Sequence, residues 1–144
     1  MNETIAQFVN SKQIAVVGVS DKKMGGAVYK ELKQRGYTVY PVHPTRQTFD
    51  GDACHVSLRT LPPEVTAAII AVSPETAEVL VDDAAAAGIT HLWFQQGKNQ
   101  SKAVAKANGL GLQTVSRKCI LMYAPPVTGI HTFHRFLARL FGRV

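Results

Sequence analysis

Five apolar runs recur along the chain, and segments with a helical pattern separate them. The runs are IAVVGV (14–19), TVYPV (38–42), AAIIAV (67–72), ITHLWFQ (89–95) and LQTVS (112–116). Each run is nearly continuous in apolar residues, which is typical of parallel strands that are covered on both faces. Strands that alternate with helices indicate a βαβ series. The pattern therefore predicts an α/β fold with a doubly wound, mainly parallel five-stranded sheet flanked by helices.

Small residues mark the ends of the predicted helices. Gly36, Gly88 and Gly109 each follow a helical segment, where a residue in the left-handed conformation commonly closes a helix. Ser73 and Pro74 supply an N-cap and a first-turn proline for the segment PETAEVLVDDAAAA.

Two segments lie outside this alternation. Residues 43–64 are long and turn-rich, and we expect them to line a site. The tail predicts an amphipathic basic helix at about 129–142, with Ile130, Phe133 and Leu137 on its apolar face. We favour docking of this last helix on the sheet, and the alternative is a helix that binds a partner or a membrane.

Composition fits a single domain over residues 1–144. Hydrophobic residues make up 46% and charged residues 18%, which are the proportions of a globular protein. Cys54 and Cys119 lie far apart, so neither a zinc ribbon nor a redox dithiol is indicated. The N-terminus has an acid where a signal peptide carries basic residues, and no apolar run approaches membrane-spanning length. We therefore expect a soluble cytoplasmic protein with no membrane partner.

The distribution of charge narrows the class of ligand. The net charge is +6, and every acidic residue lies at or before Asp83, so the C-terminal part is purely basic. This asymmetry fits a polyanionic ligand or nucleic acid. The aromatic residues are not interleaved with the basic ones, as they are where a protein stacks single strands. We therefore favour a small polyanion and expect no nucleic-acid partner.

The loop after the first strand, GVSDKKMGG, has features of a phosphate site. Gly18 permits a tight turn, Ser20 can donate a hydrogen bond, and the two glycines at 25–26 allow backbone N–H groups to approach a phosphate. The two lysines at 22–23 add positive charge. The loop matches neither G-x-G-x-x-G nor G-x-x-x-x-G-K-[ST], so a purely structural turn from strand to helix is the alternative.

The ends of three later strands carry the other candidate groups. After the second strand, His43 and Pro44 stand where NAD-binding folds place a carboxylate, and Arg46 suits a ribose phosphate such as that of NADP or coenzyme A. A solvated surface arginine is the alternative. Val72 can pack on an adenine, and residues 95–97 offer amide groups and a close backbone approach, or form a polar β-to-α turn.

Catalytic and metal-binding constellations are not evident. The histidines have no Asp or Ser partner for a triad. His131 and His134 lack a third metal ligand, so a basic solvated face is the favoured interpretation. Neighbouring positive charge favours a thiolate at Cys119, but we favour a buried structural cysteine there. No catalytic residue and no metal ligand is predicted.

Taken in order, five motifs from Ile14 to Met122 resemble the small stand-alone CoA-binding proteins. The motifs are VVGVS, GYTVYPVHP, the stretch from Gly51 through SLRTLPP, LWFQQG and KCILM. They are similar to the family's first loop and its G-Y-x-V-x-P-V-N-P, G-x-x-x-x-x-S-L-x-x-I-P, V-W-L-Q-x-G and R-C-I-M patterns. Family members are Rossmann-type domains akin to the nucleotide-binding domain of the succinyl-CoA synthetase alpha subunit.

The resemblance implies binding of coenzyme A, with the pyrophosphate at the first loop, the adenosine part near Pro44 and Val72, and the pantetheine near Gln95 and Gly97. The sequence departs from the family where glycines at 25–26 stand in place of Ser-Tyr and where His43 replaces Asn. The residues nominated for binding are Gly18, Ser20, Lys22, Lys23, Gly25, Gly26, Pro44, Arg46, Val72, Ser73, Pro74, Gln95 and Gly97.

Three functional hypotheses follow. The leading hypothesis is a binding protein for coenzyme A or an acyl-CoA without catalysis of its own. An NADP-dependent reductase is the enzyme alternative, although no Tyr-x-x-x-Lys pair is evident. The third is an interaction module whose basic C-terminal helix docks an acidic partner or forms a homodimer.

Overall fold

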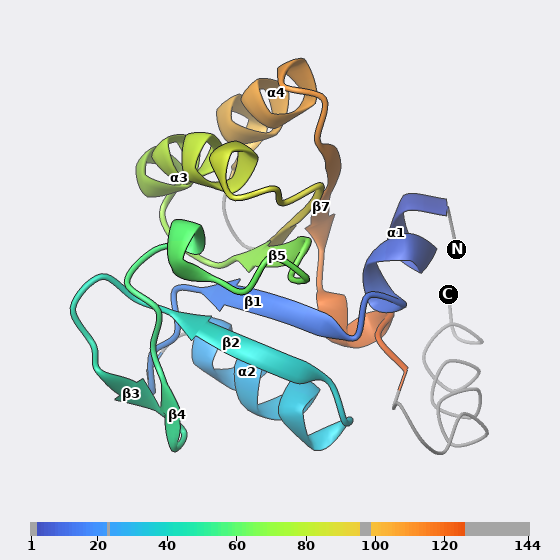
Figure 1. The fold of residues 1–144 in the computed structure, drawn as a ribbon. Helices are drawn as coiled ribbons and strands as arrows, with labels where there is room; N and C mark the ends of the chain where they lie inside the picture. The colour runs from blue at the N-terminus through green and yellow to red at the C-terminus, as the bar shows by residue number, and fades with distance from the viewer. Residues whose placement is uncertain (1–2, 23, 96–98, 126–144) are drawn as a thin grey trace.

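The computed structural model describes residues 3–22, 24–95 and 99–125 and contains one central parallel sheet (Figure 1). Its strands are β1 (Gln13–Val17), β2 (Thr38–Val42), β5 (Ala67–Ile70), β6 (His91–Gln95) and β7 (Gln113–Lys118). They lie in the order β2-β1-β5-β6-β7, and each neighbouring pair is parallel. The predicted five-stranded parallel sheet is confirmed.

Helices cover both faces of this sheet. They are α1 (Glu3–Val9), α2 (Met24–Gln34), α3 (Pro74–Ala86) and α4 (Ser101–Gly109). In Figure 1, α3 and α4 lie above the sheet and α2 lies below it. The inner strands β1, β5 and β6 therefore bury both of their faces, which is why their sequences are nearly continuous apolar runs, whereas the edge strands β2 and β7 are partly exposed.

Alternate residues of each strand enter two separate cores. In β1, Ile14 and Val16 pack with side chains of α1 and α2, whereas Ala15 and Val17 pack with side chains of α3 and α4. Trp93 of β6 belongs to the first core, where its ring meets Phe8 of α1 edge to face at 5.3 Å. This two-sided burial is the doubly wound arrangement that the sequence predicted.

The ends of the helices agree with the predictions at two of three positions. Gly36 and Gly88 have φ angles of +96° and +84° beyond the ends of α2 and α3. The prediction for Gly109 is wrong, because this residue is the last of α4 and the left-handed position is Gly111, with φ +85°. Leu110 adds one more residue to the helix end by donating its N–H to Ala107 and Lys106.

The turn-rich segment 43–64 contains a small hairpin and a 3-10 turn. The hairpin pairs β3 (Thr48–Phe49) with β4 (Asp52–Ala53), and the turn η1 covers Leu58–Thr60. His55 extends along the outer edge of the sheet, donating its N–H to Pro41 O at 2.8 Å and accepting from His43 N at 2.9 Å. The segment thereby covers the edge strand β2.

The described part of the chain ends shortly after a second 3-10 turn, η2 (Ile120–Met122). No helix within this part has the length and apolar character needed to cross a membrane. The predicted helix at about 129–142 lies outside the described residues.

Candidate functional site

The carboxyl ends of β1 and β5 form the point at which the direction of winding reverses. From β1 the chain forms β2 on one side, and it later returns to place β5 on the other side. Open α/β sheets hold their ligands at such a point. A cavity of about 530 Å³ opens there, and we call it the switch-point cavity. Its lining residues are Val17, Gly18, Val19, Ser20, Val42, His43, Pro44, Val56, Ser57, Ala71, Val72, Ser73, Thr76, Leu80 and Asp83.

Gly18 forms the floor between the two strands and has no room for a side chain. Its φ is +100°, and a Cβ there would lie 2.3 Å from the carbonyl oxygen of Ala71. The chain after β1 therefore passes directly against the chain after β5. This close approach brings the first and third loops of the sheet into one cavity.

The glycines at 25–26 have a packing role that the sequence alone did not indicate. Both are buried in the first turn of α2. A Cβ on Gly25 would lie 2.4 Å from Gly18 O, and one on Gly26 would lie 1.8 Å from Ser20 O. The absence of side chains lets α2 press against the loop that lines the cavity. Neither glycine is itself among the lining residues.

His43 shapes the second wall of the cavity. Its Nδ1 accepts the backbone N–H groups of Thr45 at 3.1 Å and Arg46 at 2.9 Å, so the ring proton of the neutral form lies on Nε2. These two bonds are those that an Asn or Asp side chain makes in a turn. His43 thus closes the turn through Pro44 in place of the asparagine of the family pattern.

The third wall is one face of α3 and the turn before it. Ser73 is the N-cap residue as predicted, but its hydroxyl pairs with the Thr76 hydroxyl at 3.0 Å and not with a backbone N–H. Thr76, Leu80 and Asp83 follow at intervals of four and three residues, which places them on one helix face. The spacing of these three residues after Ser73 was a readable signal in the sequence, but the residues predicted for binding did not include them.

Five of the nominated residues meet at the cavity, namely Gly18, Ser20, Pro44, Val72 and Ser73. The others lie elsewhere or outside the described residues. Lys22 is exposed, and its N–H donates to Ser20 Oγ at 3.3 Å. Pro74 occupies the first turn of α3. Lys23 and Gly97 are not among the described residues.

Arg46 and Gln95 have partners inside the protein. The Arg46 guanidinium pairs with Asp21 at 3.1 Å, donates to Thr48 O at 2.8 Å and lies over the Phe49 ring. Gln95 is buried, and its amide donates to Cys119 Sγ at 3.0 Å and accepts from Ile120 N at 3.2 Å. The Gln95 amide therefore ties the end of β6 to the turn η2.

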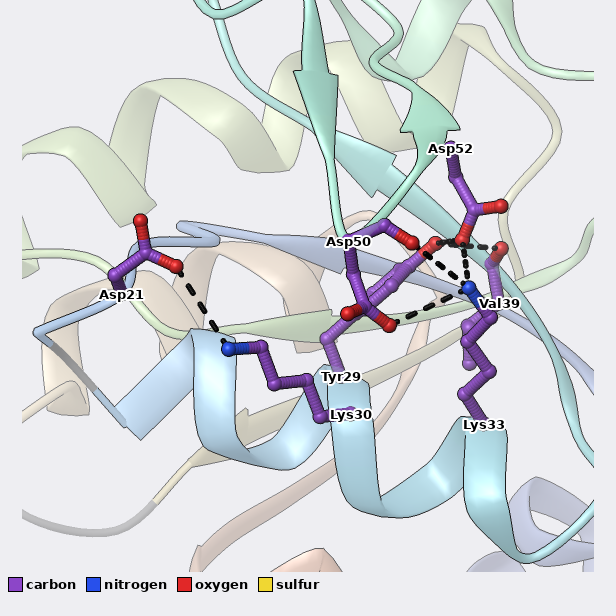
Figure 2. A network of polar contacts seen from close by, with 7 residues as sticks. All are labelled: Asp21, Tyr29, Lys30, Lys33, Val39, Asp50 and Asp52. Carbon is purple, nitrogen blue, oxygen red and sulfur yellow. Dashed lines mark hydrogen bonds and ion pairs between the residues drawn. The ribbon is translucent and has the colours of Figure 1, made fainter.

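A polar network fastens the hairpin to α2 beside the site (Figure 2). The Tyr29 hydroxyl donates to the Asp52 carboxylate and lies 3.4 Å from Val39 O. Lys33 donates to Asp52 at 2.9 Å and to the Asp50 backbone carbonyl at 3.0 Å. The hairpin, which follows the second wall of the cavity, is thereby held at a fixed position on α2.

The network shifts the pKa values of its members. Hydrogen bonds from Tyr29 and then Lys33 hold the pKa of the Asp52 carboxyl below its usual range. Burial, and then the hydrogen bond to Asp52, raise the pKa of the Tyr29 hydroxyl far above its ordinary value. Asp52 is therefore ionised and Tyr29 neutral at physiological pH.

A second cavity, of about 350 Å³, lies between α4 and β7. Its lining residues are Gln100, Ser101, Val104, Ala105, Asn108, Ser116 and Arg117. Gln100 connects it to the first site, because its amide Nε2 donates to Val72 O at 3.0 Å. Within the described residues, no group of three His, Cys, Asp or Glu side chains is arranged to hold a metal ion.

Comparison with known proteins finds a matching family and several similar proteins. A family model described as CoA binding domain matches residues 12–125. The alpha subunit of ADP-forming acetate–CoA ligase II from Pyrococcus furiosus is 28% identical over 126 residues, covering 78% of this chain and 28% of that protein. ADP-forming acetate–CoA ligase I from Archaeoglobus fulgidus is 26% identical, covering 86% of this chain and 20% of that protein. The chain thus spans less than a third of these curated relatives.

Solved structures agree on the fold. A hypothetical protein from Pyrococcus horikoshii OT3 aligns with a TM-score of 0.77 at 28% identity, covering 95% of this chain and 92% of that one. A conserved hypothetical protein from Pyrococcus furiosus aligns with a TM-score of 0.72 at 31% identity, covering 76% of this chain and 96% of that one. Both relatives match over nearly the whole of their own length.

Proposed function

The chain belongs to the CoA binding domain family, and from that premise we propose that it binds coenzyme A or an acyl-CoA in the switch-point cavity. The observation that carries the proposal is the meeting of three loops at the carboxyl ends of β1, β2 and β5. Gly18 and Ser20 offer polar backbone and hydroxyl groups on one wall, while Pro44 and Val72 offer apolar surface on the others. Such a mixture suits a nucleotide, which has a flat apolar base and a charged phosphate chain.

The charges around the cavity suggest how the ligand lies. Among the described lining residues, Asp83 is the single formally charged side chain, and it pairs with Arg59 at 2.8 Å. The Asp83 carboxylate repels phosphate, and the loop of Ser20 leads into the N-terminus of α2, where backbone N–H groups favour an anion, so we place the pyrophosphate beside Ser20. Lys22 and Lys23 follow Ser20 in the sequence and would supply positive charge to the pyrophosphate, whereas Arg46, two residues after Pro44, would meet the ribose 3′-phosphate. The glycines at 25–26 would act by holding α2 close to the same loop.

In this proposal, the remaining nominated residues lie along the path of the pantetheine arm of coenzyme A. The arm would begin near Val72 and near Ser73 and Pro74, where α3 starts. It would then pass across the ends of β5 and β6 toward Gln95 and Gly97. The Gln100 amide supports this path, since it fixes the Val72 carbonyl between the two cavities.

We propose binding without catalysis as the role of this chain. The acetate–CoA ligase names belong to proteins of which the chain spans 28% and 20%. Their activity is therefore not carried over, and the acyl group that accompanies coenzyme A is left to experiment.

Isothermal titration of coenzyme A into matched variants of α3 tests the proposal. Thr76 is exposed and lines the cavity, whereas Val79 is exposed on the same helix and does not line it. We expect Thr76→Trp to weaken binding of coenzyme A at least tenfold by filling the cavity, and Val79→Trp to leave binding unchanged. Wild-type protein that binds NADPH but gives no heat with near-millimolar coenzyme A would contradict the proposal and support the reductase alternative.

A further inference from the structure

Asp21 connects the two walls of the switch-point cavity through an ion pair. Asp21 directly follows Ser20, which lies on the first wall, formed by the loop after β1. Arg46 lies two residues after Pro44, which is on the second wall. Arg46 Nη2 lies 3.1 Å from Asp21 Oδ2. Lys30 Nζ of α2 lies 3.7 Å from the other carboxylate oxygen, as Figure 2 shows. The carboxylate thus has one cation on the hairpin side and a second on the helix.

Arg46 is held in place by contacts that do not involve Asp21. Its Nε donates to Thr48 O at 2.8 Å, its guanidinium carbon lies 5.0 Å from the centre of the Phe49 ring, and its backbone N–H bonds to His43. A guanidinium fixed in this way loses little further freedom when it binds a phosphate. Its side chain is 37% exposed, so a ligand can reach it from solvent.

We propose that Asp21 is a built-in competitor for the phosphate that Arg46 binds. The inference rests on the proposed function and concerns the ribose 3′-phosphate of coenzyme A. A phosphate entering at Arg46 replaces the Asp21 carboxylate, and Asp21 keeps Lys30 as its counter-ion. After the exchange, Arg46 is paired with the phosphate and Asp21 with Lys30. The ion pair that joined the first and second walls of the cavity is then broken. Asp21 therefore lowers affinity most for ligands that carry the 3′-phosphate.

The size of the effect follows from the exposure of the pair. Asp21 is 62% exposed, and exposed ion pairs contribute little because water screens them. Removing the Asp21 charge should tighten binding of coenzyme A by about two- to fivefold. Binding of 3′-dephospho-coenzyme A should change less, because that ligand has no 3′-phosphate to exchange with the carboxylate.

The test is isothermal titration of both ligands, at one ionic strength, into wild-type protein and the Asp21→Asn, Asp50→Asn and Arg46→Gln variants. Asp50→Asn is the matched control, since Asp50 is also an exposed carboxylate but pairs with Lys33 at 3.3 Å. We expect Asp21→Asn to raise the preference for coenzyme A over the dephospho form, Asp50→Asn to leave it unchanged and Arg46→Gln to abolish it. Arg46→Lys, which retains the charge, replaces Arg46→Gln if thermal melting shows that the latter is unfolded.

The outcomes separate the inference from the proposed function. Equal tightening of both ligands by Asp21→Asn would show a general effect of charge and overturn the inference, as would an unchanged affinity for coenzyme A. Both results would leave the proposed function standing. Wild-type protein that binds neither ligand would overturn the proposed function and the inference with it.

Discussion

Gly26 and Gly109 are both helical glycines, but their surroundings are opposite. A Cβ at Gly26 would lie 1.8 Å from Ser20 O, whereas a Cβ at Gly109 would meet no atom within 4 Å. We expect Gly26→Ala to lower the free energy of unfolding by about 1 to 3 kcal/mol through overpacking, and to weaken coenzyme A binding by displacing Ser20. Gly109→Ala should raise stability by up to about 1 kcal/mol, because alanine favours the helix. Denaturant unfolding of both variants measures the contrast, and equal effects would contradict it.

His91 makes the stability of the fold depend on pH in the mildly acidic range. Its ring lies 2.8 Å from both Thr90 Oγ1 and Gln7 Oε1, and burial lowers its pKa from the usual value of 6.5. The folded state therefore favours the neutral ring, and the unfolded chain binds the proton more readily. This contribution to stability is complete above pH 6.5 and is lost as the pH falls through the lower folded pKa.

The His91→Gln variant isolates this contribution. We expect the melting temperature of the wild-type protein to fall between pH 7.5 and 5.5 by more than that of the variant, because glutamine does not titrate. Thermal melts at several pH values measure the difference. Parallel pH profiles for the two proteins would show that His91 is not the group responsible.

Sequence reasoning at the residue scale identified some side chains of the cavity and missed their neighbours. Gly18 and Val72 were found because each lies at the carboxyl end of a predicted parallel strand, and such strand ends meet at one edge of a sheet. The pairing of Arg46 with Asp21 joins residues 25 positions apart across the cavity. It depends on the turn at His43, so no local pattern predicts it.

At the scale of elements, the hairpin is held on α2 mainly by Tyr29, Lys33 and Asp52 (Figure 2). We expect Tyr29→Phe to lower the free energy of unfolding by about 1 to 2 kcal/mol, because it removes a buried hydroxyl that donates to a carboxylate. Tyr37→Phe is the matched control, since Tyr37 is buried but its hydroxyl makes no hydrogen bond among the described residues. Denaturant unfolding at pH 7 gives the two values.

The effect of Tyr29→Phe on the free energy of unfolding should depend on pH. The pKa of Asp52 is lowered in the folded state, so its stabilising contribution is complete above the ordinary pKa of 3.8 and is lost as the pH falls through the folded value. The stability difference between wild type and Tyr29→Phe should therefore shrink at and below that range. A difference that stays constant down to pH 2.5 would contradict the role given to Asp52.

The order and type of the major elements followed from the pattern, but the small elements did not. The helix α1 spans seven residues, with Ile5, Phe8 and Val9 buried, which is too short to give a clear helical period. The hairpin had a readable signal in Asp50-Gly51, whose φ angles of +52° and +82° suit a two-residue turn. It was missed because its strands are only two residues long.

At the scale of the whole molecule, the chain corresponds to one part of larger relatives and to the whole of smaller ones. It covers 28% of the Pyrococcus furiosus ligase subunit but 96% of a solved protein from the same species. The family model matches residues 12–125, which include the parallel sheet and its switch point. We therefore assign ligand binding to this part, and the claim to be tested is that the ligand lies in the switch-point cavity.

Titration of coenzyme A into isotopically labelled protein, followed by amide NMR spectra, tests that claim most directly. We expect the amides of residues 17–20, 42–43 and 71–73 to shift together with one dissociation constant, because these three stretches line the switch-point cavity. The amides of Val104, Ala105 and Asn108, which line the cavity between α4 and β7, should respond little. Shifts centred on Val104, Ala105, Asn108, Ser116 and Arg117, or no shifts at near-millimolar coenzyme A, would contradict binding in the switch-point cavity.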